Sequence, residues 1–193
     1  MTTITVVKKD GYVAIAADTL TKWGSGKESA EYVVNHEKIV QTGDSYIAVT
    51  GSATFKLILA EYFSEADPAD IRLDTSTNIF KTWNKLHAVL KEHYFLQAEE
   101  DKDDELESTR MDVLIANPHG IFGVAAHRTV QEFSRFYAYG SGSDYALGAL
   151  YSVYNQPEKS AEEIARHAIV AAAEFDDRSG LPVTSYSIKL ISG

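Results

Sequence analysis

The fold begins with residues 2–18, which read TTITVVKKDGYVAIAAD. Residues 2–9 and 12–18 are two runs rich in strand-forming side chains, and Asp10-Gly11 lies between them. That dipeptide suits the positive φ angles of a tight turn. The stretch therefore predicts a β-hairpin, with Thr2 at its start and Asp18 at the end of its second strand.

Outward from this hairpin, turn residues and changes of hydrophobic period predict the other elements. Residues 19–30 carry Gly24-Ser25-Gly26 and predict a polar loop or a second hairpin. Further strands are expected at residues 32–41, 45–50, 111–117, 121–127, 131–139 and 183–191, and helices near 53–63, 79–94, 143–154 and 161–175. Ser160 and Glu163 have the spacing of a capping box for the last helix.

This order of strands, two helices, strands, two helices and a strand predicts an α+β fold. A four-layer α/β/β/α sandwich accommodates it, although periodicity alone leaves other α+β layerings open. The chain has 193 residues, 45% of them hydrophobic, which suits one sizeable core. We expect a single domain over residues 2–193.

Composition argues against several classes of partner. The formal net charge is -10 and no cluster of Lys and Arg is present, so neither nucleic acid nor a membrane is an expected partner. The chain has no cysteine, and its N-terminus lacks the pattern of a signal peptide, which favours the cytoplasm. No metal-binding motif joins the histidines, and we expect neither a metal nor a cofactor.

Three residues suggest hydrolytic chemistry. Removal of Met1 before a small Thr leaves Thr2 with a free amine beside its hydroxyl, so one residue supplies a base and a nucleophile. An α-amine ordinarily has a pKa of about 8, so part of it is neutral near pH 7. Lys38 stands among apolar strand residues and Asp18 ends a strand, so each can neutralise the other. A cation near the Thr2 amine lowers its pKa and favours the neutral base. A surface ion pair is the plain alternative.

Two glycine-containing junctions add weaker signals. Gly51 follows a strand and precedes a helix, so its amide can donate to a developing oxyanion, or it can simply form a turn. Gly140-Ser141-Gly142-Ser143 also precedes a helix and leaves a phosphate-binding loop open, but no Gly-Lys-Ser/Thr follows. No Gly-x-Ser-x-Gly elbow supports a Ser-His-Asp hydrolase.

Together these residues resemble the proteasome β-subunit family, including HslV-type peptidases, over nearly the whole chain. Within the family the chain looks most like the betaproteobacterial proteasome homologues. The stretches that carry the resemblance are Thr2-Thr3-Ile4, Ile15-Ala16-Ala17-Asp18, Lys38-Ile39, Thr50-Gly51, Gly140-Ser141-Gly142 and Asp176-Asp177-Arg178-Ser179-Gly180.

The resemblance implies a fold, an activity and an assembly. The fold is that of the N-terminal nucleophile hydrolases. The activity is a threonine-type endopeptidase that cleaves unfolded polypeptides through an acyl-enzyme. The assembly is a homo-oligomer of stacked rings, expected as a tetradecamer, with an ATP-dependent unfoldase as a conceivable partner.

The resemblance also implies roles for named residues. Thr2 is the nucleophile, Lys38 the cation that lowers a pKa, Asp18 its orienting partner and Gly51 the oxyanion donor. Other positions hold the Thr2 amine, namely Ser141, Asp176 and Ser179. A third set lines the specificity pocket and suggests modest apolar substrate side chains, namely Thr21, Val49 and Ala53.

The sequence departs from the family pattern between Asp18 and Lys38, where the interval is longer. Lys22 stands where proteasomes usually have Thr, and its long cationic side chain can obstruct or redirect a substrate. Two other functions therefore remain open: a catalytically silent ring-forming subunit, and an amidohydrolase for small amides.

Overall fold

The computed structural model of the chain describes residues 2–97 and 105–191. The expected removal of Met1 lies outside the described residues, as do residues 192–193 of the expected domain. Within the described part, no helix is both long and apolar enough to cross a membrane.

The first hairpin belongs to a four-stranded antiparallel sheet. Lys9 pairs with Tyr12 across Asp10 and Gly11, whose φ angles are 51° and 78°, so the predicted turn is confirmed. The strand order is β10-β1-β2-β11. The bounds are β1 Thr3–Lys9, β2 Tyr12–Ala17, β10 Phe136–Gly140 and β11 Thr184–Lys189.

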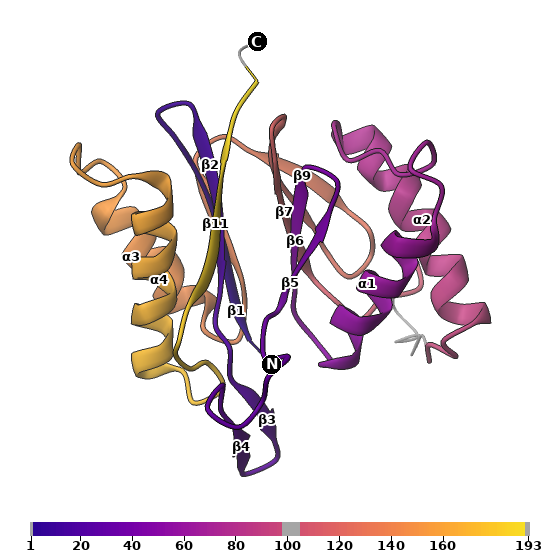
Figure 1. The fold of residues 1–193 in the computed structure, drawn as a ribbon, viewed down its shortest axis with the longest axis horizontal. Coiled ribbons are helices and arrows are strands. Elements are labelled where there is room, and N and C mark those ends of the chain that lie inside the picture. The colour runs from indigo at the N-terminus through magenta and orange to yellow at the C-terminus, as the bar shows by residue number, and fades with distance from the viewer. Residues whose placement is uncertain (1, 98–104, 192–193) are drawn as a thin grey trace.

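A second, five-stranded sheet has the order β5-β6-β7-β8-β9 and is also antiparallel. Its bounds are β5 Ile39–Thr42, β6 Ser45–Val49, β7 Val113–Asn117, β8 Gly120–Val124 and β9 Val130–Phe133. The two sheets face each other across one apolar cluster, to which Ile4 and Ile15 contribute from the first sheet and Leu114 from the second (Figure 1).

Helix pairs cover the outer faces of the two sheets (Figure 1). Helices α3 (Ser143–Val153) and α4 (Ala161–Phe175) pack on the four-stranded sheet through a cluster that includes Val7 and Ala14. Helices α1 (Thr54–Glu65) and α2 (Ser76–Glu92) pack on the five-stranded sheet through a second cluster around Trp83. The fold is thus mixed α/β, as predicted. The capping box of Ser160 and Glu163 is also present.

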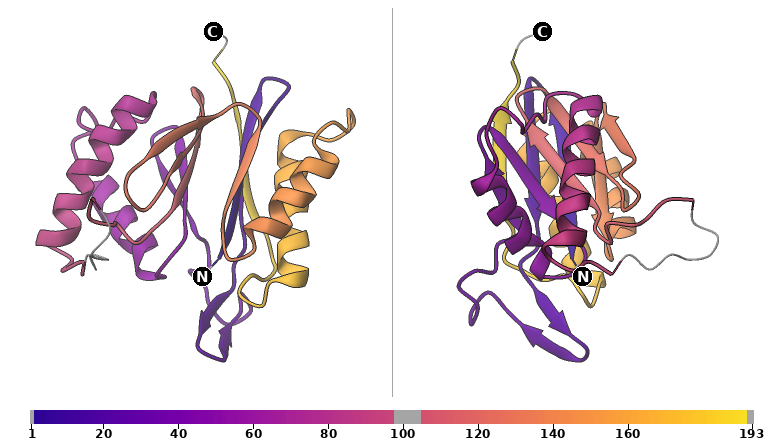
Figure 2. Two further views of the ribbon diagram at one scale, coloured as in Figure 1. Left: turned by 180° about the vertical axis from the view of Figure 1, so that it is seen from behind. Right: turned by 90° about the vertical axis from the view of Figure 1, so that its right-hand side faces the viewer.

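The sequence predicted either a polar loop or a second hairpin for residues 19–30, and the structure has the hairpin. Strands β3 (Thr21–Trp23) and β4 (Gly26–Glu28) pair with each other and extend beyond the sheets at the end where Thr2 lies (Figure 2). Trp23 is 60% exposed, so little apolar surface holds this hairpin against the body.

The predicted extents of two strands were wrong. Of residues 32–41 only the end is a strand, because the preceding segment makes turns and leaves Tyr32 and Val34 in solvent. Residues 131–139 form two strands instead of one. Strand β9 ends at Phe133 in the five-stranded sheet, and the chain then crosses to the other sheet as β10.

Candidate active site

The candidate site lies at one end of the two sheets, where three chain segments meet. Thr2 directly precedes β1, Asp18 directly follows β2, and Lys38 directly precedes β5. Antiparallel pairing of Ile4 with Ala17 brings Thr2 and Asp18 together. All three side chains are buried: Thr2 is 3% exposed, Asp18 0% and Lys38 8%. The surface ion pair considered from sequence is therefore wrong.

The hydroxyl of Thr2 lies between the two buried charges. Lys38 Nζ donates a hydrogen bond to Thr2 Oγ1 and one to Asp18 Oδ1 at 2.9 Å. The Thr2 hydroxyl in turn donates to Asp18 Oδ1. Lys38 also donates to the carbonyl of Leu20 at 2.5 Å, which fixes the ammonium beside the hydroxyl.

The carboxylate of Asp18 is held by the backbone as well as by Lys38. Amides of Thr3, Leu20 and Gly180 each donate to it at 3.0 Å. These donors fix both carboxylate oxygens and compensate the burial of the charge. The sequence placed Asp18 at the end of a strand but contained no sign of this amide cradle, which comes from three separate segments.

Burial lowers the pKa of Lys38, and the negative charge of Asp18 opposes that change. Taking an ammonium out of water disfavours its charged form, whereas a nearby carboxylate favours it. A lysine in this balance loses its proton more readily than one at the surface. Strongly perturbed groups of this kind are concentrated at catalytic sites, although structural ion pairs show them too.

A second group of hydrogen bonds lies beside Thr2 and Thr3. The hydroxyls of Ser141 and Ser179 both donate to Asp176 Oδ2, at 2.7 and 2.6 Å. The oxygens of Ser179 and Thr3 lie 2.7 Å apart. The structure thus brings Ser141, Asp176 and Ser179 together next to the chain start, while their role at the Thr2 amine stays a prediction.

The glycine-rich loop at Gly140 serves the N-terminal strand. A Cβ at Gly140 would lie 1.8 Å from the carbonyl oxygen of Thr2, and its φ is +106°, so only glycine fits. The amide of Ser141 donates to that carbonyl at 2.9 Å, and the amide of Gly142 donates to Thr3 Oγ1 at 3.1 Å. Because these amides bind the protein's own chain, the phosphate-loop alternative loses its support.

A pocket of about 100 Å³ opens beside Thr2. It contains the predicted positions Thr21, Val49, Ala53 and Gly51. Gly51 has a φ of +99°, and a Cβ there would lie 2.8 Å from the carbonyl oxygen of Arg110. Among the described residues its amide has no hydrogen-bond acceptor, so it is available to a ligand in the pocket.

Sequence reasoning missed some residues of this pocket, namely Leu20, Ser52 and Lys56. Lys22, which the sequence analysis placed near a substrate, also lines it, together with Thr2, Trp23 and Lys38. The signal for Lys56 was present, because it follows Ala53 by one helical turn and shares its face. A larger cavity of about 470 Å³, lined in part by Asp44, Arg72 and His119, contains none of the clustered site residues. The site is therefore defined by its chemistry and not by cavity size.

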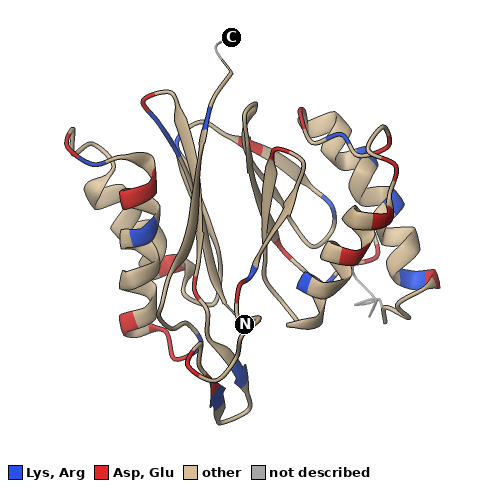
Figure 3. Cartoon of the chain, viewed as in Figure 1, with Lys and Arg blue, Asp and Glu red and all other residues tan. Residues whose placement is uncertain are grey.

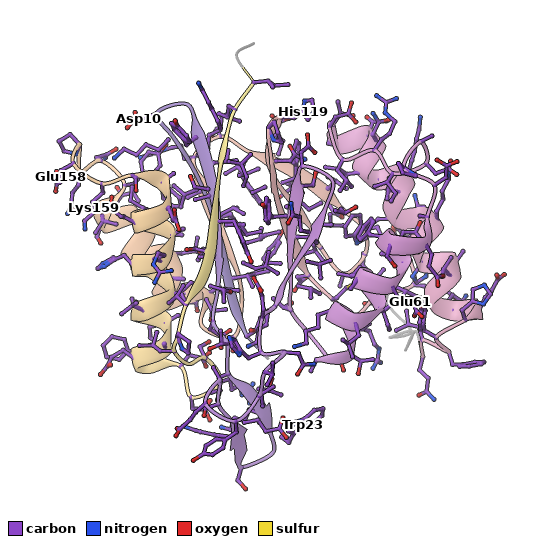
Figure 4. The ribbon with its side chains drawn as sticks, viewed as in Figure 1. Asp10, Trp23, Glu61, His119, Glu158 and Lys159 are labelled. Atoms are coloured by element: carbon purple, nitrogen blue, oxygen red, sulfur yellow. The ribbon has the colours of Figure 1, made fainter. Side chains whose placement is uncertain are left out.

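Lys22 is paired instead of free. Its ammonium donates to the carboxylate of Asp177, and its side chain is only 16% exposed. Its neighbour Trp23 projects from the hairpin (Figure 4), and its indole nitrogen donates to Glu28 at 3.1 Å. Lys22, where the sequence departs from the family pattern, thus connects the hairpin of β3 and β4 to the loop after α4.

Across residues 2–97 and 105–191, no group of three or more His, Asp or Glu side chains is arranged to hold a metal ion. No protein-family model matches the chain, and no curated protein matches it significantly.

Comparison with solved structures first identifies the class of protein to which this fold belongs. HslV from Trypanosoma brucei has a TM-score of 0.72 at 19% identity, covering 97% of this chain and 99% of its own. That likeness shows a shared fold. The fold and the buried Thr2, Asp18 and Lys38 cluster together define a protein of the proteasome type.

The family follows from a nearer relative, the bacterial proteasome homologue of Thiobacillus denitrificans, BPH. It is 65% identical, with a TM-score of 0.94, and the match covers 99% of this chain and all of that one. The same protein in complex with epoxomicin has a TM-score of 0.93 at 65% identity, covering 98% of this chain. The chain belongs to the family of bacterial proteasome homologues.

Proposed function

We propose that this protein is an N-terminal threonine endopeptidase that hydrolyses unfolded polypeptides. The observation that carries the proposal is the buried hydroxyl of Thr2, which both Lys38 Nζ and Asp18 Oδ1 bind. A structural threonine does not need a buried ion pair at its hydroxyl, because desolvating two charges costs free energy. The relationship to a homologue solved with epoxomicin supports the same conclusion.

The arrangement of helices on sheets is proposed to be the four-layer α/β/β/α sandwich of the N-terminal nucleophile hydrolases, forming one domain over residues 2–193. Three apolar clusters support this layering, one between the sheets and one under each helix pair. The site lies at an open end of the layers. There the start of β1 is held by its neighbours, yet a substrate can still reach it through the pocket.

The mechanism begins with removal of Met1, which frees the α-amine of Thr2. The positive charge of Lys38 stabilises the developing alkoxide at Thr2 Oγ1 and keeps the amine neutral. The hydroxyl proton passes to that amine while Oγ1 forms a bond to the substrate's carbonyl carbon. The carbonyl oxygen becomes an oxyanion, to which the Gly51 amide donates.

Collapse of this tetrahedral intermediate breaks the peptide C–N bond. The leaving nitrogen takes the proton from the Thr2 amine, and an ester on Thr2 Oγ1 remains. The same amine then takes a proton from water, whose oxygen attacks the ester carbonyl carbon. The bond between that carbon and Thr2 Oγ1 breaks, Oγ1 takes the proton back from the amine, and the carboxylic acid product leaves. Asp18 orients Lys38 throughout, and the Ser141, Asp176 and Ser179 group is proposed to orient the amine.

The family relationship also supports an assembly in stacked rings, proposed here as a cytoplasmic tetradecamer. Ring closure by contacts between identical subunits encloses the sites, so folded proteins are excluded. An ATP-dependent unfoldase is then a fitting partner. The proposed chemistry uses no cofactor.

The proposal is tested by incubating the assembled protein with a polypeptide that lacks stable structure and identifying the products by mass spectrometry. Internal cleavage, absent in Thr2→Ala, supports an endopeptidase. Release of acyl groups from small amides without internal cleavage supports the amidohydrolase instead. Intact rings that cleave neither class of substrate support the silent subunit.

A further inference from the structure

The pocket beside Thr2 is cationic although the chain as a whole is acidic. Its lining includes Lys22, Lys38 and Lys56, and no Asp or Glu is among its lining residues. The formal net charge of the chain is -10, so this local excess of ammonium groups is opposite to the average. Figure 3 shows basic segments on β3 and β4 and near the start of α1 at this end of the molecule, with acidic segments beside them, so the local charge follows from the pocket lining and not from the whole end.

The three ammonium groups differ in how their charge is balanced. Lys38 is paired with Asp18, and Lys22 is paired with Asp177. Lys56 donates to the backbone carbonyl of Asn35. Among the described residues, no carboxylate is ion-paired with Lys56, although the negative charge of Glu37 acts on it, so Lys56 is the one pocket ammonium without a carboxylate partner.

The environment of Lys56 favours an incoming anion. Burial lowers the pKa of Lys56, and the negative charge of Glu37 opposes that change. The Glu37 carboxylate itself accepts a hydrogen bond from the hydroxyl of Tyr186. An ammonium has three donors, so Lys56 can keep its bond to Asn35 and still bind a carboxylate.

The place of Lys56 relative to the reacting atoms identifies what it would bind. In the proposed mechanism, Thr2 and the Gly51 amide fix the position of the scissile carbonyl. Val49, Ala53 and Lys56 line the same pocket, and Ala53 and Lys56 are one turn apart on one helix face. A substrate side chain that enters this pocket beside the scissile carbonyl therefore meets Lys56.

We propose that this pocket selects a peptide residue with a carboxylate side chain, Asp or Glu, on the acyl side of the cleaved bond, with Lys56 as its cationic partner. This replaces the apolar preference that Thr21, Val49 and Ala53 suggested from sequence. The inference rests on the proposed peptidase function and adds its substrate class. The pocket of about 100 Å³ holds a few water molecules, so a short side chain suits it.

The test compares pairs of fluorogenic peptides that differ only in charge at that residue, Glu against Gln and Asp against Asn. The readout is the ratio of kcat/KM within each pair, which is independent of the fraction of active enzyme. We expect the acidic peptide to be preferred about tenfold, as for one partly desolvated charge-assisted hydrogen bond. Added salt is expected to reduce the ratio.

Variants assign the preference to Lys56. Lys56→Met is expected to bring the ratio near one, whereas Lys56→Arg is expected to retain it. Lys81→Met is the matched control, because Lys81 is exposed on α2 and does not line the pocket. A ratio near one in the unmodified protein, or one that survives in Lys56→Met, overturns the inference.

Two further outcomes are distinguishable. If the side-chain pair makes no difference but amidation of a free peptide C-terminus lowers kcat/KM, the carboxylate bound is the chain end and the inference is wrong. If neither acidic nor neutral peptides are cleaved, and a peptide epoxyketone gives no adduct, the proposed function fails and the inference fails with it. An adduct together with a ratio near one rejects only the inference.

Discussion

Lys38 Nζ and Asp18 Oδ1 lie 2.9 Å apart, and both atoms bind the hydroxyl of Thr2. The pair is buried, with side-chain exposures of 10% and 0%. Because its carboxylate already has three amide donors, the pair is held in one geometry before any substrate arrives. Such preorganisation suits the role proposed for Thr2, since it removes the cost of ordering charges during a reaction.

The buried pair predicts a strong coupling between its members. Lys38→Met is expected to lower the free energy of unfolding by about 3 to 5 kcal/mol, because it leaves a buried carboxylate without its counterion. The double variant Lys38→Met with Asp18→Asn is expected to lose less than the sum of the single variants, by about 1 to 3 kcal/mol. Denaturant unfolding at fixed protein concentration measures both; strict additivity would contradict the coupling.

The close approach at Gly140 predicts that Gly140→Ala displaces the start of β1. A Cβ there meets the Thr2 carbonyl oxygen at 1.8 Å, at a φ of +106°. We expect a destabilisation of about 1 to 3 kcal/mol and loss of reaction at Thr2. Gly148→Ala is the matched control, since its Cβ would meet nothing within 4 Å inside α3. That variant is expected to be neutral or more stable by up to about 1 kcal/mol. Equal effects of both changes would show that the backbone approach is unimportant.

The capping box of α4 predicts a smaller effect away from the site. Ser160 accepts a hydrogen bond from the Glu163 amide, and the Glu163 carboxylate accepts one from the Ser160 amide. Ser160→Ala is expected to cost about 1 kcal/mol of stability. Ser152→Ala, in the exposed part of α3, is expected to change stability by less than about 0.5 kcal/mol. Thermal unfolding of the two variants side by side measures the difference, and similar midpoints would contradict a stabilising role for the Ser160 cap.

Burial raises the pKa of Tyr139 to about 12, and the Asp112 carboxylate acts in the same direction. The unfolded phenol titrates at about pH 10, so its contribution to stability is complete below that pH. The contribution is lost as pH rises from ~10 to about 12. Absorbance titration of the phenolate is expected to lose amplitude near pH 12 in Tyr139→Phe. A loss of amplitude at about pH 10 instead would contradict the raised pKa.

Local signals accounted for much of the fold. Asp10-Gly11 predicted the first hairpin, and Ser160 with Glu163 predicted the start of α4, because turn and cap chemistry acts over a few residues. The prediction of a strand over residues 32–41 was wrong because Tyr32 and Val34 favour strands by type. In the structure no neighbouring strand covers these two side chains, and both lie in solvent. Strand propensity depends on packing partners that a local pattern does not contain.

The sequence named the residues of the Thr2, Asp18 and Lys38 cluster but not their contacts. Thr2, Asp18 and Lys38 were identified from their types and from the family resemblance. The Asp18 cradle joins amides of Thr3, Leu20 and Gly180, which only tertiary structure brings together. The pairing of Lys22 with Asp177 likewise joins distant segments, so the sequence identified the cation near the substrate path but not its partner.

The most direct test of the central claim is the intact mass of the purified protein before and after incubation with a peptide epoxyketone. This reagent requires both an amine and a hydroxyl on the same N-terminal residue. We predict loss of Met1 and a single adduct on Thr2, abolished in Thr2→Ala and strongly slowed in Lys38→Met. Retention of Met1, or a free Thr2 that forms no adduct, would contradict the claim that Thr2 is the nucleophile.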